Sequence, residues 1–323
     1  MSIRKAWKYG VKLPMKRAWL KASGREPIIQ PSFLDPSDPD PRIDFEYPED
    51  AAGEDAPQLG SGLCTLRQLT SPAFKYWLTN LGQSTSRKHR KLWELAYVTQ
   101  ALYERGCLAP GKRGLGFAVG EEPLPAFYAD QGVDVLATDL DADDERSKVW
   151  RRSGQHMSNV SQDEPQLTHA GGRILQRSVD MNHIPRDLRG FDFTWSTCSF
   201  EHCGSIDLGL GFLEKQMECL RPGGIAVHTT EFNLTSNEST IKEGRTVLFR
   251  RSDIEGVVER LQKDGHEVEP LSFDPGDQEF DRHVDWPPYS EDLHMRLVLG
   301  RYAATSIGLI IRKADAQAAS SAA

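Results

Sequence analysis

The sequence lacks long hydrophobic runs, paired cysteines and an excess of positive charge, and each absence narrows what the protein can be. No stretch of its 323 residues approaches the ~20 apolar residues of a membrane-spanning helix. A formal net charge of −8 argues against a general nucleic-acid binder, so we expect no nucleic-acid partner. The five cysteines form no paired framework, and an odd count is typical of a reducing compartment. We therefore expect free thiols in a cytoplasmic protein.

Residues 1–62 differ in composition from the rest of the chain. Residues 1–24 are basic, carry aromatic side chains and contain no acid. They suit peripheral contact with an anionic membrane surface or an acidic partner, or docking on the acidic body of the protein itself. Residues 26–62 are dense in Pro, Asp and Gly, which predicts an acidic linker or extended arm. We expect this leader and arm to be partly flexible.

The rest of the chain is predicted to form a helical cap, a main domain and a tail. Residues 63–106 form the cap, because residues 87–105 carry apolar side chains at helical spacing and stop at Gly106. Residues 107–313 form the main domain, and residues 314–323 form a frayed, disordered tail. The sequence carries no signal for an oligomeric state.

Apolar runs alternate with helical patterns through the main domain. After a first strand before Gly114, strands are predicted at residues 133–138, 173–179, 191–197, 225–230, 266–273 and 305–312. This alternation implies a parallel sheet with helices on both faces. Only a loop, residues 274–301, links the last two strands, so the last strand is expected to be antiparallel. The predicted fold is α/β, a seven-stranded, mostly parallel, doubly wound sheet with an antiparallel last strand.

A turn rich in small residues follows the first strand. Gly116, Ala118 and Gly120 let backbone N–H groups approach a ligand, and Asp139 ends the next strand about 20 residues on, where an acid suits ribose hydroxyls. The pattern predicts a nucleotide-type pocket at the carboxyl edge of the sheet, although the same turn also forms as a packing solution without a ligand. The spacing G-x-G-x-A-x-G differs from the dinucleotide G-x-G-x-x-G, which disfavours a nicotinamide enzyme.

With five motifs in order, residues 107–312 resemble the class I S-adenosylmethionine-dependent methyltransferases. The glycine turn matches the first motif, Asp139 the ribose-binding acid, and Asp180 with Met181 the adenine-contacting pair. The segments SFEHCGS (199–205) and CLRPGG (219–224) are similar to the motifs that follow the fourth strand and precede the fifth. The resemblance implies binding of S-adenosyl-L-methionine, with S-adenosyl-L-homocysteine as product, at Gly116, Ala118, Gly120, Asp139, Asp180, Met181 and Ser196.

The sequence departs from the family pattern at two positions. Gly114 stands where the family carries an acid that helps to hold the amino group of the cofactor, and Ala118 replaces the middle glycine. The missing acid either passes its role to Glu121 or Glu122 or weakens binding. The pattern also looks like uncharacterised bacterial methyltransferases of surface-polysaccharide gene clusters, which implies a role in polysaccharide biosynthesis. Contact through residues 1–24 would place the protein on the inner face of the membrane.

Two side chains are predicted to be catalytic. An alcohol acceptor benefits from a base that takes its proton, whereas a neutral amine attacks unaided. His202, after the fourth strand, and Glu231, at the end of the fifth, are placed for this, although His202 also suits cofactor-loop structure and Glu231 also suits acceptor binding. The predicted acceptor-binding residues are His228 inside the fifth strand, Asn233 after it, and Trp286 and Tyr289 in the loop 274–301. The alternative for His228 is a buried core histidine. The alternative for the two aromatics is that they seal the helical cap.

No metal site is predicted. Cys198, His202 and Cys203 lack a second ligand pair at zinc spacing, and a divalent ion held by Glu231 and acids of residues 274–285 ranks low. We predict an enzyme of class EC 2.1.1.-, which O-methylates a hydroxyl of a glycan or small molecule. The alternatives are a catalytically silent cofactor-binding module, which would explain Gly114, and a nicotinamide-dependent oxidoreductase.

Overall fold

The computed structural model describes residues 58–157, 166–167 and 171–315. The basic leader, with its predicted membrane contact, most of the acidic arm and most of the tail lie outside these residues. Among the described residues, no helix is both long enough and apolar enough to cross a membrane.

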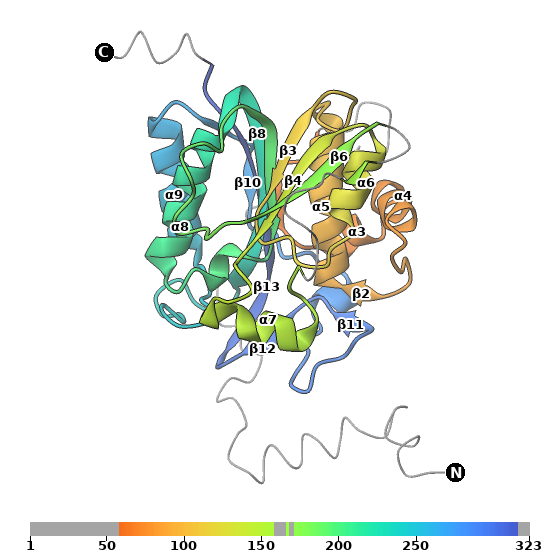
Figure 1. Cartoon of the computed structure of the whole chain (residues 1–323). Coiled ribbons are helices and arrows are strands. Elements are labelled where there is room, and N and C mark those ends of the chain that lie inside the picture. Colours follow the sequence, from red (N-terminus) through yellow and green to blue (C-terminus); the bar gives the residue numbers. More distant parts are fainter. Residues whose placement is uncertain (1–57, 158–165, 168–170, 316–323) are drawn as a thin grey trace.

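One large sheet runs through the molecule (Figure 1). Its strand order is β10-β1-β13-β8-β7-β3-β4-β6-β5, and β12 and β9 also pair with β13. The central strands are parallel, whereas β13 runs antiparallel to β8. The bounds are β1 Ser61–Leu63, β3 Arg113–Gly116, β4 Asp134–Asp139, β5 Gln166–Leu167, β6 Arg173–Ser178, β7 Phe191–Thr197, β8 Leu220–Asn233, β9 Glu267–Val268, β10 Leu271–Ser272, β12 Leu297–Leu299 and β13 Tyr302–Arg312.

The mostly parallel α/β sheet with an antiparallel last strand is confirmed, but the strand count differs. The sheet has eleven strands in the described part of the chain rather than seven. The predicted strand 266–273 is divided into β9 and β10, because Pro270 lies between them and lacks the N–H that a continuous ladder needs. The other additions, β1, β5 and β12, are at most three residues long.

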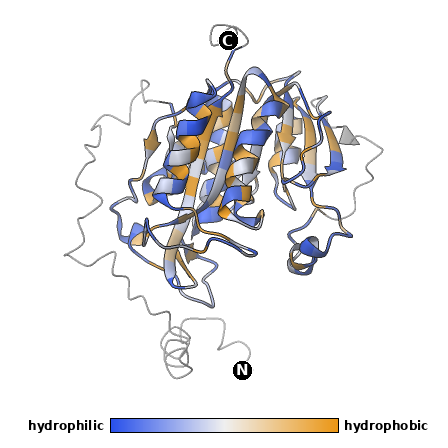
Figure 2. Cartoon of the chain, turned by 90° about the vertical axis from the view of Figure 1, so that its left-hand side faces the viewer, coloured by the Kyte–Doolittle hydropathy of each residue, from blue (hydrophilic) through white to orange (hydrophobic). Residues whose placement is uncertain are grey.

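Helices cover both faces of the sheet (Figure 1). On one side lie α3 (Leu66–Leu69), α4 (Pro72–Asn80), α5 (Arg90–Glu104) and α6 (Leu124–Asp130); on the other lie α8 (Ile206–Gln216) and α9 (Arg251–Lys263). Two apolar clusters fill the core. In Figure 2 the strands are largely hydrophobic or neutral, and the helices around them carry the hydrophilic patches.

The helix α5 of the predicted cap packs directly on the sheet. Tyr97 is fully buried and approaches β13 so closely that an added Cβ on Gly308 would lie 2.2 Å from its ring. The helix begins at Arg90, later than predicted, because the side chain of His89 accepts a hydrogen bond from the N–H of Lys91 and caps it. Residues 63–106 thus supply part of the layer that covers the sheet.

Several short elements gather at the carboxyl edge of the parallel strands (Figure 1). They are β2 (Lys88–His89), β11 (Leu293–His294), α7 (Lys148–Ser153) and the turns η2 (Glu145–Ser147), η3 (Phe200–His202) and η5 (Glu279–Asp281), while η4 (Met217–Cys219) ends α8.

The start of α9 differs from the prediction that Ser252 opens a capping box. The helix begins at Arg251, and Asp253 accepts hydrogen bonds from the backbone and the guanidinium of Arg250. The helix is therefore capped at Arg250, two residues before Ser252.

Candidate active site

The predicted cofactor turn, residues 116–120, is fixed between neighbouring strands. The N–H of Phe117 donates to a carbonyl of β7 at 2.9 Å, and the N–H of Val119 donates to a carbonyl of β4 at 3.0 Å. Ala118 and Gly120 both have a φ of 50°, in the left-handed region that favours glycine. The turn therefore has a defined shape at the point where β3 ends.

Large aromatic rings explain two glycines of this strand. An added Cβ on Gly114 would lie 2.4 Å from Cζ of Phe193, and one on Gly116 would lie 2.4 Å from Cζ2 of Trp195. Both distances are shorter than real contacts, so both positions need glycine. At Gly114, where the family carries an acid, the ring of Phe193 fills the space that the acid's side chain would need.

Asp139 ends β4 beside the turn. Its buried carboxylate accepts hydrogen bonds from the backbone N–H groups of Leu140 at 2.8 Å and Met157 at 3.1 Å. Burial raises the pKa of Asp139, and these N–H groups oppose that shift. The N–H of Val119, in the turn, donates to the carbonyl of Thr138, the residue before Asp139, at 3.0 Å. The glycine turn and the predicted ribose-binding acid are thus brought together.

Asp180 follows β6, which pairs with β4 up to Asp139. Its carboxylate accepts hydrogen bonds from Arg146 and from the backbone of Asn182, both at 2.9 Å. Burial favours the neutral acid, but these hydrogen bonds lower the pKa of Asp180 below its ordinary value. The side-chain oxygen of Asn182 is buried and has no hydrogen-bond partner among the described residues. Met181, the residue between Asp180 and Asn182 in the chain, is also buried.

Ser196 and His228 lie in the core. Both are fully buried, and the Ser196 hydroxyl and Nδ1 of His228 are hydrogen-bonded at 2.8 Å. Burial lowers the pKa of His228 to about 3, so the ring is neutral. Phe212 of α8 packs edge-on against it at 5.3 Å. The structure gives these two predicted ligand residues each other as partners.

The helix α7 and the residues after it lie over the predicted cofactor turn. The carbonyl of Gln155 sits 2.2 Å from where a Cβ of Gly120 would be, and the Met157 N–H reaches Asp139. At the other end, the ring of Trp150 lies 4.5 Å from that of His202. This segment therefore spans from the end of β4 to the turn that follows β7.

His202 is anchored by its own neighbours. Its Nδ1 donates to the carbonyl of Arg245 at 2.8 Å, and the hydroxyl of Thr246 lies 3.2 Å from the same nitrogen. Together with the Trp150 contact, these bonds hold η3 against the loop after β8.

Glu122 reaches the end of β7 from the far side of the turn. Its carboxylate accepts hydrogen bonds from the indole of Trp195, at 2.8 Å, and from the hydroxyl of Thr197. Burial raises the pKa of Glu122 to about 7, and the two hydrogen bonds oppose the shift. A carboxyl group is therefore present near the turn although Gly114 carries none.

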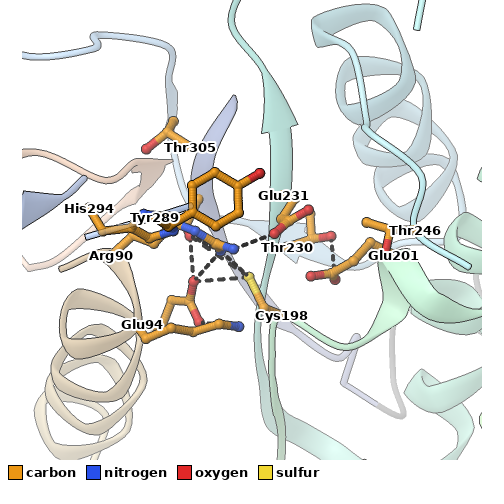
Figure 3. Close-up of polar contacts among 12 residues, drawn as sticks. Arg90, Glu94, Cys198, Glu201, Thr230, Glu231, Thr246, Tyr289, His294 and Thr305 are labelled. Atoms are coloured by element: carbon orange, nitrogen blue, oxygen red, sulfur yellow. Dashed lines mark hydrogen bonds and ion pairs between the residues drawn. The ribbon is translucent and has the colours of Figure 1, made fainter. Parts of the chain in front are cut away.

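A buried network of charged side chains joins α5 to the ends of β7, β8 and β13 (Figure 3). Arg90 pairs with Glu231 and, at 3.1 Å, with Glu94; all three are less than a tenth exposed. Arg90 also reaches the sulfur of Cys198 at 3.1 Å and the hydroxyl of Ser306 at 3.2 Å. Predicted catalytic residue Glu231 is thus held by an arginine from a different layer of the fold.

Unpartnered atoms remain at the rim of this network. Oε2 of Glu231, Oε1 of Glu201 and Nε of Arg90 are buried without a hydrogen-bond partner among the described residues. The other oxygen of Glu201 accepts from the hydroxyl of Thr230 at 2.8 Å, and burial raises the pKa of Glu201. Such atoms carry a desolvation cost that a ligand with hydroxyl groups would relieve.

The remaining predicted acceptor residues lie apart from one another. Asn233 makes four hydrogen bonds that fold the loop after β8. Trp286 is partly buried against a small apolar cluster. Tyr289 is 41% exposed and lies beside Glu231 and His294 in Figure 3. Of these residues, Tyr289 is the one that Figure 3 shows near Glu231.

Four side chains of this edge were missed in the sequence: Arg90, Glu94, Asp285 and His294. The signal for the first two was an i,i+4 pair of opposite charge on a helix whose buried residues occur all round it. Nothing in the sequence distinguished His294 from other polar residues of its loop. In the part of the chain that the structure describes, no group of three His, Cys, Asp or Glu side chains is arranged to hold a metal ion.

Comparisons with known proteins give a short match and a fold. No protein-family model matches the chain. A stretch of 87 residues is 30% identical to the malonyl-[acyl-carrier protein] O-methyltransferase of Salmonella typhimurium, covering 26% of this chain and 34% of that protein. The chain therefore spans about a third of the length of this curated relative.

Solved structures of methyltransferases are also similar, at low identity. They include phosphoethanolamine N-methyltransferase 2 of Haemonchus contortus in complex with S-adenosyl-L-methionine (TM-score 0.41, 14% identity, 75% of this chain and 56% of that chain). Magnesium protoporphyrin IX methyltransferase of Synechocystis, with bound S-adenosylmethionine, has a TM-score of 0.39 and 11% identity over 76% of this chain and 93% of that one.

The strand order identifies the fold independently of these scores. The parallel strands β6, β4, β3, β7 and β8, followed by antiparallel β13, form the mostly parallel sheet with an antiparallel last strand that the sequence predicted. The chain has the class I methyltransferase fold.

Proposed function

We propose that the protein is an S-adenosylmethionine-dependent methyltransferase that methylates the oxygen of a hydroxyl on a glycan or small molecule. The observation that carries this proposal is the position of the glycine turn beside Asp139 at the carboxyl edge of a class I sheet, where the N–H of Val119 donates to the carbonyl of Thr138. Transfer to oxygen is further supported by the short match to an O-methyltransferase.

The residues of the turn would hold the methyl donor. Asp139 would accept hydrogen bonds from the ribose hydroxyls, in exchange for the N–H of Met157. Asp180 and the unpartnered oxygen of Asn182 suit the adenine amino group. Glu122 takes the role of the acid missing at Gly114, since a carboxylate near the turn would pair with the donor's amino group. The bound donor supplies the methyl group.

Residues near the carboxyl ends of β7 and β8 would hold the acceptor. Glu231, fixed by Arg90, presents one free carboxylate oxygen. An acceptor placed there would be aligned with the donor, which is the main requirement of an in-line displacement. The bonds of His202 to the loop after β8 favour a positioning role for this histidine.

Calorimetry with S-adenosylhomocysteine tests the donor site. Asp139→Asn should weaken binding by about 10-fold or more, because a hydrogen bond to a charged group contributes roughly 1.5–3 kcal/mol. Asp134→Asn is the matched control: it opens the same strand and pairs with Arg173 at the surface, so affinity should not change.

The alternatives give different outcomes in the same assay. Binding without methyl transfer to any extract of small molecules or glycans would indicate a catalytically silent module. Heat with NADH and none with S-adenosylhomocysteine would overturn the proposal in favour of a nicotinamide-dependent enzyme.

A further inference from the structure

A buried carboxylate–imidazole pair lies next to the acceptor side of the sheet edge. Nδ1 of His294 is 2.7 Å from a carboxylate oxygen of Asp285, and both side chains are less than a tenth exposed. The rings of His89 and Tyr289 lie 4.7 and 5.0 Å from that of His294. The proposed function gives this pair no role.

The pair is held rigidly. The backbone of Asp285 bonds to Arg296 and Val298, both at 2.9 Å, and its carboxylate also accepts from the N–H of Ser290 at 2.6 Å. His294 is in register with His89 in the small β11–β2 sheet. A carboxylate on Nδ1 fixes the tautomer with its proton there, so the lone pair of the other ring nitrogen, Nε2, is free to take a proton.

Tyr289 packs against the pair. Its ring lies 5.0 Å from that of His294, and Figure 3 draws it on the side of the pair that faces Glu231. Its hydroxyl donates to the carbonyl of Val298 at 2.7 Å, so the ring has a fixed place. Burial, followed by the negative charges of Glu231 and Asp285, raises the pKa of Tyr289.

Building on the proposed function, we propose that the acceptor hydroxyl binds between Glu231 and His294 and that Nε2 of His294 is the base that takes its proton. As the acceptor oxygen forms its bond to the methyl carbon and the carbon–sulfur bond breaks, the hydroxyl proton passes to Nε2. Asp285 stabilises the resulting imidazolium, which later releases the proton to water. Glu231, already paired with Arg90, accepts a hydrogen bond and does not act as the base.

The charges indicate the class of acceptor. Arg90 is shared by Glu94 and Glu231, and Lys91 pairs with Glu94 at 3.2 Å, so these cations are already engaged. The unpartnered oxygens of Glu231 and Glu201 accept hydrogen bonds. A neutral molecule with several hydroxyls, such as a glycoside, satisfies them, whereas an anionic acceptor would be repelled.

Methyl transfer to methyl glucoside, used as a neutral polyol probe, tests the base. His294→Ala should lower kcat by about 100-fold or more, and free imidazole should restore part of it, since general bases contribute roughly 10²–10⁴-fold. His283→Ala, a half-buried histidine of the same loop, is the matched control and should keep wild-type turnover. The affinity of His294→Ala for S-adenosylhomocysteine should equal that of the wild type, which shows that the fold and donor site are intact.

The NMR signals of the histidine and tyrosine rings supply a readout besides turnover. Methyl glucoside should perturb the signals of His294 and Tyr289, whose rings lie 5.0 Å apart.

The outcomes separate the two proposals. Absent S-adenosylhomocysteine binding in the wild type sinks the proposed function, whatever the ring signals of His294 show. Normal binding and turnover, with His294→Ala within twofold of the wild type or without rescue by imidazole, overturns His294 as the base. If methyl glucoside is neither methylated nor able to perturb the His294 and Tyr289 signals, the neutral polyol class is overturned.

Discussion

The two ends of the carboxyl edge hold their carboxylates in different ways. On the donor side, Asp139 is satisfied by backbone N–H groups, and Asp180 by one backbone N–H and a half-exposed arginine. On the acceptor side, one carboxylate oxygen each of Glu94 and Glu231 is paired with the buried Arg90. A carboxylate held by backbone depends on the local turn, whereas one held by a buried ion depends on packing between layers.

This difference predicts where the molecule is sensitive. Removing one partner of a buried ion pair leaves an uncompensated charge, which costs far more than the loss of an exposed pair. The acceptor side should therefore combine chemistry with stability, and the donor side should tolerate side-chain changes that leave its backbone intact.

Arg90→Ala should have the largest effect on stability. It leaves Glu231 buried without its cation and Glu94 with Lys91 alone, so we expect a loss of about 3–5 kcal/mol in the free energy of unfolding. Arg251→Ala is the matched control, because Arg251 and Glu255 form an exposed i,i+4 pair of the same type, with an expected loss of about 0.5 kcal/mol or less. Urea unfolding of both variants measures the contrast, and equal small losses would contradict the buried network.

The same division decided how much could be predicted from the sequence. The glycine turn and Asp139 could be placed because each follows a strand directly, and parallel strands bring their carboxyl ends to one edge. The parallel sheet with helices on both faces followed from alternating strands and helices, and the antiparallel β13 followed from the helix-free loop before it.

The acceptor side could not be predicted, since its contacts join residues far apart in the chain. Arg90 meets Glu231 across 141 positions, and α5 is buried on so many sides that an apolar stripe does not reveal its charged contacts. His228 illustrates the opposite case: as a polar residue in a central strand it suited a site, but Ser196 of the next strand pairs with it inside the core.

Glu122→Gln should change how stability depends on pH. The pKa of Glu122 is about 7 in the folded state against 4.5 for the free side chain, so the native state binds the proton more tightly. Stability from this group is therefore fully present below about pH 4.5 and is lost as the pH rises to 7. The variant lacks this decline and should be more stable above pH 7, by up to about 3 kcal/mol.

Thermal unfolding between pH 4 and 8 measures this difference. Glu121→Gln, one residue away, is the control and should keep the wild-type decline. A parallel dependence in wild type and Glu122→Gln would show that the carboxyl of Glu122 titrates at its ordinary pKa.

Gly114→Ala tests why the family acid is missing. Its Cβ would lie 2.4 Å from the ring of Phe193, and such overpacking costs about 1–3 kcal/mol. Gly211→Ala, in α8 with nothing within 4 Å of its added Cβ, should instead stabilise by roughly 0.5–1 kcal/mol. Aspartate has the same Cβ, so placing the family's acid at this position would destabilise the strand and would not strengthen cofactor binding. A Gly114→Ala variant as stable as the wild type would contradict this explanation.

Arg146→Ala should have the smallest effect and completes the comparison with Arg90. Arg146 pairs with Asp144 and Asp180 but its side chain is 50% exposed, so water replaces the lost contacts and the loss of stability should stay below about 1 kcal/mol. Because an exposed pair is screened by salt, even this difference should shrink at about 1 M salt, where the screening length is roughly 3 Å. The loss at Arg90 should persist there, since its partners are buried. A salt-insensitive loss of several kcal/mol at Arg146 would mean that the donor side is as tightly locked by side-chain ions as the acceptor side.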